Sequence, residues 1–304
     1  MALMGPKQAE EKLGGVQAPL RFGVAALVVG NILLSFGPLF VRMADTGPVA
    51  SAFWRVTLAV PFLFLIARQT GDPARRLSRP LLWLLALSGL FFAADLASWH
   101  IGILTTKLAN ANLLGNSTSF LLPLWAFAVA RQWPTRMQGA AMIIAALGAG
   151  LLLGRSYELS SDNVAGDFLC ILAGVFYTGY LVLMARAKDN LGPWPALAWS
   201  TLMSVPPLLG MALLAGDVMV PTQWTPLLAL TLCSQILGQG LMIYAIGRVA
   251  PLLFGLTLLL QPVVGAALGW IMYKETLTSL DWAGGALIGL ALLLVRQPDS
   301  GKSA

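Results

Sequence analysis

The chain has 304 residues, of which 58% are hydrophobic and only 11% are charged. A soluble domain carries about 25% charged residues, so this composition excludes a water-facing globular protein and predicts a polytopic membrane protein. The net charge of +6 does not indicate a nucleic-acid partner, because the basic residues fall in short loops between apolar segments.

Apolar segments of the length needed to cross a bilayer as a helix, about 17–25 residues, follow one another along the chain. Clusters of Gly, Pro and Asp, such as Asp45-Thr46-Gly47-Pro48, separate them. The polar ends, residues 1–21 and 297–304, are expected to form tails outside the membrane. The sequence predicts an all-α fold with ten spans, near residues 22–42, 49–67, 79–102, 106–130, 136–154, 164–186, 194–215, 224–247, 250–272 and 280–296.

The distribution of Lys and Arg predicts how these spans are oriented. With ten spans, 14 of the 19 basic residues fall on the side of the N-terminus and four on the other side. The remaining one, Arg55, falls inside the second span. Cytoplasmic loops carry an excess of Lys and Arg, so we expect both tails to be cytoplasmic.

The chain also contains an internal repeat. Five residues recur 144 or 145 positions later, namely Arg42, Gly47, Pro48, Trp54 and Pro61 as Arg186, Gly192, Pro193, Trp199 and Pro206. We therefore predict two five-span repeats, residues 22–154 and 164–296. Because five is odd, the second repeat must enter the bilayer upside down. Inverted repeats are typical of secondary transporters, whose halves rock around a central site.

Two charged residues, Arg55 and Asp95, fall well inside predicted spans. Both lie on the order of 10 Å below the outer surface, at 1.5 Å per residue. Charged side chains in hydrocarbon are costly, so they mark the protein interior or a substrate path. Either the two form a structural ion pair between neighbouring helices, or they form a charged pair at a cavity wall that clamps a zwitterion or switches partners during transport.

Neutral amides add to the predicted interior. Asn112 and Asn116 lie four residues apart in the fourth span, and Gln235 and Gln239 lie four apart in the eighth. Each pair therefore shares one face of an α-helix. These side chains either form hydrogen bonds between helices or line a hydrated cavity that binds substrate.

Aromatic residues complete the candidate substrate-binding set. Tyr177 and Tyr180 lie three apart in the sixth span, whereas Trp99 and Tyr244 lie near span ends, where rings commonly form interfacial belts. Each of these aromatic residues either belongs to an interfacial belt or lines the cavity. His100, the sole histidine, is either hydrogen-bonded at the interface or contacts substrate and relays a proton. One histidine cannot form a multi-histidine metal site, so no metal is expected.

The motifs that would indicate ATP-driven pumping are absent from the sequence. It contains no Walker loop and no soluble domain large enough to bind ATP. We expect no cofactor, and we expect transport to be driven by the substrate gradient or by a proton. Cys170 and Cys233 lie in apolar segments and are predicted to pack as small hydrophobic residues.

Two regions carry recognisable motifs. The first is Ser35-Phe36-Gly37-Pro38-Leu39-Phe40-Val41-Arg42, followed by Gly47-Pro48 and Phe53-Trp54-Arg55. The second contains Gly238-Gln239-Gly240-Leu241, Leu259-Leu260-Gln261-Pro262-Val263-Val264, Tyr273-Lys274-Glu275-Thr276-Leu277 and Asp281-Trp282-Ala283-Gly284-Gly285. Over residues 22–296 the chain resembles EamA-type members of the drug/metabolite transporter superfamily. One departure is Arg131-Gln132-Trp133-Pro134, which stands where a Gly-Glu-Arg-like turn is common in the family.

The resemblance implies ten helices in two inverted repeats and a central cavity lined mainly by spans 1, 3, 4, 6, 8 and 9. It implies an exporter in a bacterial inner membrane, with a small-molecule substrate and the lipid bilayer as partners. The most similar functions are those of bacterial amino acid exporters, including exporters of aromatic amino acids. The competing functions are efflux of drugs or other metabolites, a membrane-embedded lipid flippase or enzyme, and a structural or receptor protein.

Overall fold

The structure is a computed structural model that describes residues 17–70, 77–106, 108–154, 161–273 and 277–296. Within these ranges the protein is almost entirely helical, with a single bridge between Ile246 and Val249 in place of any sheet. The helices are α2 (Gln17–Leu34), α3 (Gly37–Met43), α4 (Pro48–Gln69), α5 (Arg79–Thr105), α6 (Leu108–Gly115), α7 (Thr118–Ala130), α8 (Arg136–Gly154), α9 (Val164–Leu191), α10 (Pro193–Leu214), α11 (Thr225–Ala229), the π-helix η1 (Leu230–Gly238), α12 (Gln239–Ala245), α13 (Pro251–Thr257), α14 (Leu260–Tyr273) and α15 (Ser279–Arg296).

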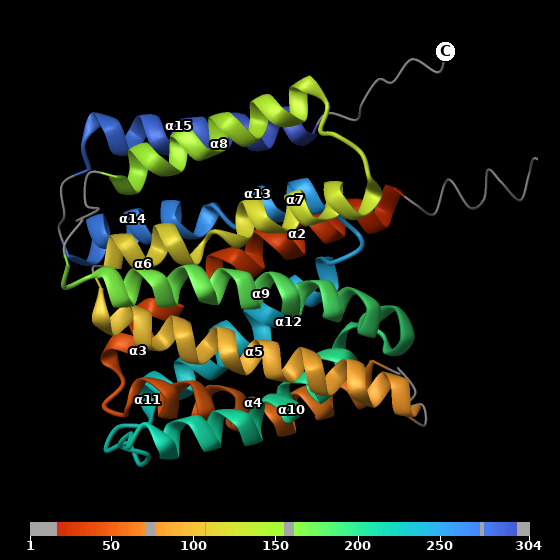
Figure 1. The fold of residues 1–304 in the computed structure, drawn as a ribbon, viewed down its shortest axis with the longest axis vertical. Helices are drawn as coiled ribbons and strands as arrows, with labels where there is room; N and C mark the ends of the chain where they lie inside the picture. The colour runs from red at the N-terminus through yellow and green to blue at the C-terminus, as the bar shows by residue number, and fades with distance from the viewer. Residues whose placement is uncertain (1–16, 71–76, 107, 155–160, 274–276, 297–304) are drawn as a thin grey trace, which may run out of the picture.

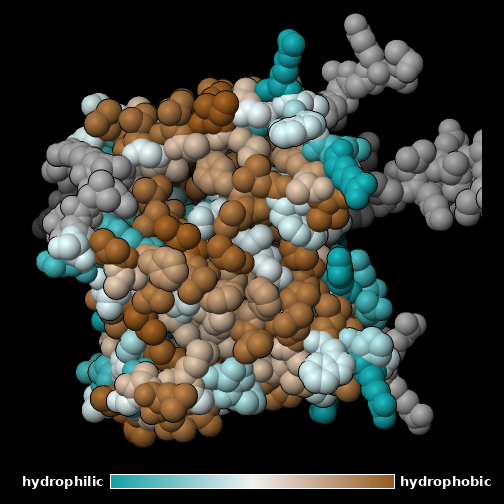
Figure 2. Space-filling model, in the orientation of Figure 1, coloured by the Kyte–Doolittle hydropathy of each residue, from teal (hydrophilic) through white to brown (hydrophobic). Residues whose placement is uncertain are grey.

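Apolar side chains cover the middle of the molecule. In Figure 2 they form the central part of the visible surface, and hydrophilic side chains gather towards its left and right edges. Within the described residues, eight helical segments are long and apolar enough to cross a membrane, and two apolar helices are shorter, Arg136–Leu152 and Ser279–Val295. The protein is therefore a multi-span membrane protein, as the sequence predicts.

The helical segments follow the order of the predicted spans, with differences at their ends. The fourth predicted span starts at residue 106, whereas its membrane-length segment is Asn110–Ala130. Helix α2 begins at Gln17 and so enters the predicted N-terminal tail, residues 1–21, although its apolar segment starts at Arg21. The predicted C-terminal tail lies outside the described residues.

Helices from the two halves of the chain pack against one another throughout the bundle. Helices α8 and α15 lie together at one end of the long axis, α4 and α10 lie at the other end, and α5 packs on α9 between them (Figure 1). The first pair crosses closely at Gly148 and Gly284. A Cβ atom on Gly148 would lie 2.8 Å from the carbonyl oxygen of Gly284, so a larger residue would push the helices apart.

Several spans are interrupted near their middle. Turns at residues 35–36, 116–117 and 258–259 separate α2 from α3, α6 from α7, and α13 from α14. A fourth span contains the π-helix η1, whose i→i+5 pattern is rare and often marks functional sites. Because irregular backbone at membrane depth is tolerated only where it is buried in protein or lines a cavity, these breaks point to the functional centre.

Two loops are joined at the end of the bundle opposite the start of α2 (Figure 1). The Ala50 backbone N–H donates to the Asp217 carboxylate (2.8 Å), which caps the N-terminus of α4 from the other half of the chain. Nearby, Asp45 accepts hydrogen bonds from Thr222. Chiefly through its bond from the Thr222 hydroxyl, the pKa of the Asp45 carboxyl is lowered from its ordinary value of 3.8, so the carboxylate stays ionised at neutral pH.

Candidate substrate cavity

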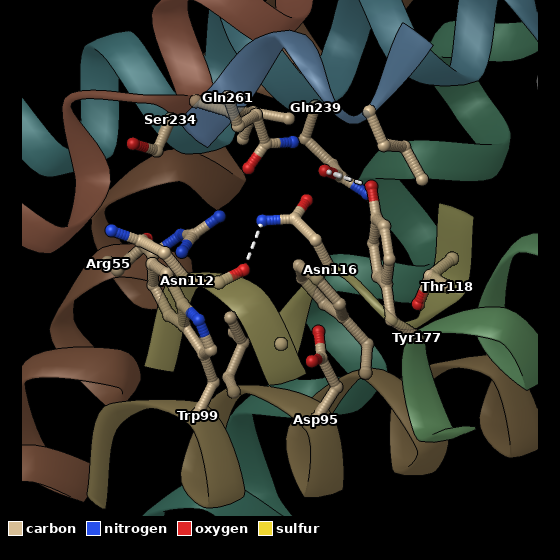
Figure 3. A pocket seen from close by; sticks show the side chains of 15 residues that line it. Arg55, Asp95, Trp99, Asn112, Asn116, Thr118, Tyr177, Ser234, Gln239 and Gln261 are labelled. Atoms are coloured by element: carbon tan, nitrogen blue, oxygen red, sulfur yellow. Dashed lines mark hydrogen bonds between the residues drawn. The ribbon is translucent and has the colours of Figure 1, made fainter. Parts of the chain in front are cut away.

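A cavity lies in the centre of the bundle, where the interrupted helices meet (Figure 3). Its wall takes residues from both halves of the chain and from most of the central helices. The lining residues are Leu34, Arg55, Phe92, Asp95, Leu96, Trp99, Asn112, Gly115, Asn116, Thr118, Tyr177, Ser234, Gln239, Leu258 and Gln261. Seven of the eleven residues predicted to bind substrate or to form the charged pair are in this wall: Arg55, Asp95, Trp99, Asn112, Asn116, Tyr177 and Gln239.

Arg55 is held by a glutamine from the other half of the chain. Its Nε donates to Gln235 Oε1 (3.1 Å), and Gln235 Nε2 donates in turn to Thr201 Oγ1 (3.2 Å). Gln235 is completely buried and is not part of the cavity wall, so it supports Arg55 and does not contact the cavity. The terminal guanidinium nitrogens donate no hydrogen bond to a described residue, and Arg55 remains a donor for a bound molecule.

Asp95 projects from α5 into the same cavity (Figure 3). Among the described residues, no hydrogen bond reaches its carboxylate, and no ion pair within 4.0 Å joins it to Arg55. In this conformation the two therefore share one cavity without a direct ion pair. A buried charge without a close partner is costly, so an ionised Asp95 needs a partner in the cavity.

Neutral hydrogen-bonding groups occupy the rest of the wall. Asn116, the first residue of the turn after α6, donates its Nδ2 to the backbone oxygen of Asn112 in α6 (2.7 Å), so this amide caps the end of α6. The Tyr177 hydroxyl donates to Gln239 Oε1 (3.2 Å), which joins α9 to α12. Each of these residues lines the cavity and keeps further donor or acceptor capacity.

Trp99 forms one side of the cavity because two glycines make room for it. A Cβ atom on Gly115 would lie 3.2 Å from the indole Nε1, and one on Gly37 would lie 3.3 Å from Cη2. The indole therefore fills the space between α3 and α6. Both glycines follow or precede a helix break, so the ring contacts two segments whose direction changes at the cavity.

His100 lies outside the cavity wall, although it follows Trp99 directly. Its ring is completely buried, with Nδ1 placed 2.8 Å from Ser51 Oγ and 3.1 Å from the backbone oxygen of Pro48. Successive residues of an α-helix point about 100° apart, so Trp99 faces the cavity while His100 packs against α4. The geometry of the cavity does not support the prediction that His100 contacts substrate.

Tyr180 and Tyr244 also lie outside the wall. The Tyr180 ring stacks on Phe92 with 4.5 Å between ring centroids, one helical turn beyond Tyr177. The Tyr244 ring is covered by the Arg248 guanidinium, 4.0 Å from its centroid. Tyr180 therefore supports the wall from behind, and Tyr244 belongs to another part of the molecule.

Three polar residues of the wall are absent from the sequence-based set: Thr118, Ser234 and Gln261. Thr118 Oγ1 donates to the backbone oxygen of Gly174 (2.7 Å), so its hydroxyl joins α7 to α9. Gln261 Nε2 donates to Asn31 Oδ1 (2.9 Å), and the Ser234 hydroxyl is buried without a hydrogen-bond partner. A Gln-Pro motif marked Gln261 in the sequence, but a single serine in an apolar span gave no comparable signal. Among the described residues, no group of three or more His, Cys, Asp or Glu could hold a metal ion.

Comparisons with known proteins agree with this geometry. Residues 164–297 match the EamA-like transporter family. The chain is 26% identical over 291 residues to the pseudopaline exporter CntI of Pseudomonas aeruginosa, covering 93% of this chain and 98% of the relative. It is 27% identical over 163 residues to the threonine/homoserine exporter RhtA of Salmonella typhimurium, covering 52% and 55% of the two chains.

A solved crystal structure shares the fold, with a TM-score of 0.76 at 16% sequence identity over 92% of this chain and 97% of the other. The similarity extends over both halves of the molecule, including the segment before the matched family region. Residues 164–297 thus carry the EamA-like transporter domain, and nearly the whole chain is similar in sequence to an exporter of a small molecule.

Proposed function

We propose that the protein exports small amphipathic metabolites, foremost neutral or aromatic amino acids, by alternating access. The observation that carries this proposal is the presence of Arg55 and Asp95 in one cavity without an ion pair between them. An arginine binds a carboxylate through several donors, and an aspartate accepts hydrogen bonds from an ammonium group. The cavity can therefore bind both charged groups of an amino acid.

The remaining wall fits the apolar part of such a substrate. Trp99 and Tyr177 offer aromatic surfaces, and Phe92, Leu96 and Leu258 offer apolar ones. Asn112, Asn116 and Gln239 add neutral hydrogen-bonding groups. A substrate with several like charges would need compensating charges that the described wall does not provide.

The relatives support an exporter of small molecules. One is named for the export of threonine and homoserine, which are amino acids, and another for the export of pseudopaline. The threonine/homoserine exporter matches about half of this chain, so we use it only to favour the amino acid class. The cavity favours neutral amino acids as a class, and transport measurements identify which of them the protein carries.

We further propose ten membrane helices in two inverted repeats, residues 22–154 and 164–296. The eight long segments and the two shorter apolar helices support this count, because together they number ten. Their contacts fit a twofold relation that exchanges each span with the one five places later. Spans two and seven pack together as α4 and α10, and spans five and ten as α8 and α15. The contact of α5 with α9 likewise corresponds to that of α12 with α2.

The same proposal places the protein in a bacterial inner membrane with both termini in the cytoplasm. The 14 to 4 distribution of basic residues supports this orientation. The start of α2 and the end of α15 lie at the same side of the bundle (Figure 1), as an even number of spans requires. Asp95 is the candidate group for coupling export to a proton, because its carboxylate faces the cavity.

The test is transport by purified protein in proteoliposomes. Labelled amino acids of different charge and size are assayed with and without a pH gradient, and protein carrying Asp95→Asn is compared with the wild type. We expect export of neutral amino acids, which the substitution reduces. Transport of lipids, or of cationic drugs in place of amino acids, would instead favour one of the competing functions.

A further inference from the structure

A second cavity, of about 340 Å³, lies next to the central one, nearer the start of α2 and the end of α9. The two cavities follow the same three helices. Four positions along a helix correspond to about 6 Å, so the cavities are arranged in series. Each helix gives one residue to the central cavity and one, four positions away, to the second: Thr118 and Leu122 of α7, Tyr177 and Leu181 of α9, and Leu258 and Phe254 at α13.

An apolar barrier separates the two cavities. Leu122, Leu181, Phe254 and Leu258 are each at most 5% exposed and belong to the main hydrophobic core. Tyr180 stacks behind them on Phe92. The path between the cavities is therefore closed in this conformation, and opening it requires α7, α9 and α13 to move apart.

The second cavity carries positive charge at its outer edge. Arg248 lies in the loop between α12 and α13, where it covers the Tyr244 ring and donates to the Tyr244 backbone oxygen. Lys188 donates to the backbone oxygen of Ile246 in the same loop (2.6 Å) and pairs with Asp189. Among the described residues, no acidic group pairs with Arg248. The edge therefore presents a fixed guanidinium beside an apolar surface.

We propose that this cavity is a second substrate site, a cytoplasmic vestibule that binds an amphipathic molecule by its carboxylate before the central cavity receives it. Arg248 binds the carboxylate, and Trp125, Leu181 and Phe254 contact the apolar part. The inference rests on the proposed function, because a vestibule has meaning only for a transported substrate. It adds a site with its own charge and its own apolar wall to the central one.

The first test compares Arg248→Gln with Arg248→Lys in proteoliposomes. With substrate supplied on the side of the termini, Arg248→Gln should raise the half-saturating concentration about tenfold, as expected for one lost hydrogen bond between charged groups. Arg248→Lys should raise it less, and saturation from the opposite side should not change. Arg131→Gln is the control, because Arg131 is exposed and is not in either cavity wall. Equal half-saturation for wild type and Arg248→Gln would overturn the vestibule.

A substrate carboxylate and a lipid headgroup would both present an anion to Arg248. The same assay is therefore run in vesicles of neutral lipid and in vesicles with roughly 30% anionic lipid, which distinguishes the two ligands. If the effect of Arg248→Gln disappears in neutral vesicles, the cavity is a lipid site and the proposal is wrong. If the wild type moves no amino acid at all, the proposed function fails together with the vestibule. Transport by the wild type with no effect at Arg248 removes the vestibule alone.

A second test does not depend on the transport rate. Ala185 lines the second cavity, whereas Ala187 on the same helix is completely buried. In a chain lacking Cys170 and Cys233, Ala185→Cys should react with a small hydrophilic thiol reagent, Ala187→Cys should not, and a transported amino acid should slow the reaction at least severalfold. Reaction at Ala185→Cys that substrate does not slow would contradict binding in this cavity.

Discussion

Gln235 fixes Arg55 across the two halves of the molecule. The Nε atom of Arg55, on α4, donates to Gln235 Oε1 on η1 at 3.1 Å, and the fully buried Gln235 is anchored by Thr201 on α10. The cation of the central cavity is therefore positioned by the half of the chain that does not carry it. Under the proposed alternating access, movement of one half against the other would change this bond.

Two substitutions at Gln235 separate stability from binding. Gln235→Leu removes the acceptor of a charged hydrogen bond, worth about 1.5–3 kcal/mol, so we expect lower thermal stability and weaker substrate binding. Gln235→Glu keeps an acceptor and adds a negative charge that pairs with the Arg55 guanidinium. We therefore expect stable protein with little transport. Melting temperature and proteoliposome transport provide the two readouts. Wild-type transport by Gln235→Glu would show that the free charge of Arg55 is not used.

Asp95→Asn should reduce transport without lowering stability. The carboxylate accepts no hydrogen bond from a described residue, and a neutral amide costs less to bury than a charge. Asp167→Asn is the matched control, because Asp167 is equally buried but accepts hydrogen bonds from Thr106 (2.7 Å) and Asn110 (3.0 Å). We expect the control to melt at a lower temperature while the remaining folded protein transports normally. The reverse pattern would assign Asp95 a structural role.

The order of the helices could be predicted from the sequence because spans of apolar residues have few alternatives in a bilayer. The interruptions could not, because a turn such as residues 116–117 replaces only a few helical hydrogen bonds and leaves hydropathy unchanged. The π-helix η1 could not be predicted either, because it too leaves the hydropathy of its span unchanged. It carries Gln235, which accepts from Arg55, and it ends directly before Gln239, which accepts from Tyr177.

The candidate site was predictable only in part for a related reason. A polar residue in a span must face protein or water, and the sequence identifies such residues without giving their direction. Trp99 and His100 are adjacent, yet only Trp99 lines the cavity. Tyr177 and Tyr180 share a helix side, yet Tyr180 lies one turn deeper, against Phe92. These distinctions depend on helix phase and depth, which only packing determines.

The turn between α6 and α7 should be accessible to water. Cysteine at Asn112 or Asn116, in a chain lacking Cys170 and Cys233, should react with a small hydrophilic thiol reagent, and substrate should slow the reaction. Ala111→Cys serves as the control, since Ala111 is completely buried next to Asn112. Unreactive cysteines at both cavity positions would indicate that the asparagines only pack against other helices.

The cap of α4 should contribute to stability rather than to binding. Asp217→Ala removes the acceptor of the Ala50 N–H, and loss of a helix cap costs about 0.5–2 kcal/mol. We expect a lower melting temperature and unchanged half-saturation. Asp189→Ala is the control, because Asp189 is exposed and forms only a surface pair with Lys188, worth about 0–1 kcal/mol. Equal melting temperatures of the two variants would contradict the role of the cap.

Neutral, bulky amino acids should be transported better than aspartate, arginine or phosphorylated metabolites. The central cavity offers one cation, Arg55, and one anion, Asp95, so it can satisfy one carboxylate and one ammonium group. An additional charge on the substrate would be left without a partner in a region of low dielectric constant.

Aromatic side chains gain about 0.5–1.5 kcal/mol against Trp99 or Tyr177 beyond their burial, which corresponds to a severalfold preference for phenylalanine over alanine. Competition by unlabelled amino acids against a labelled neutral one measures this order, and Trp99→Ala should reduce the preference for aromatic side chains most. Efficient transport of phosphate esters, with neutral amino acids ignored, would contradict both the substrate class and the assignment of the cavity.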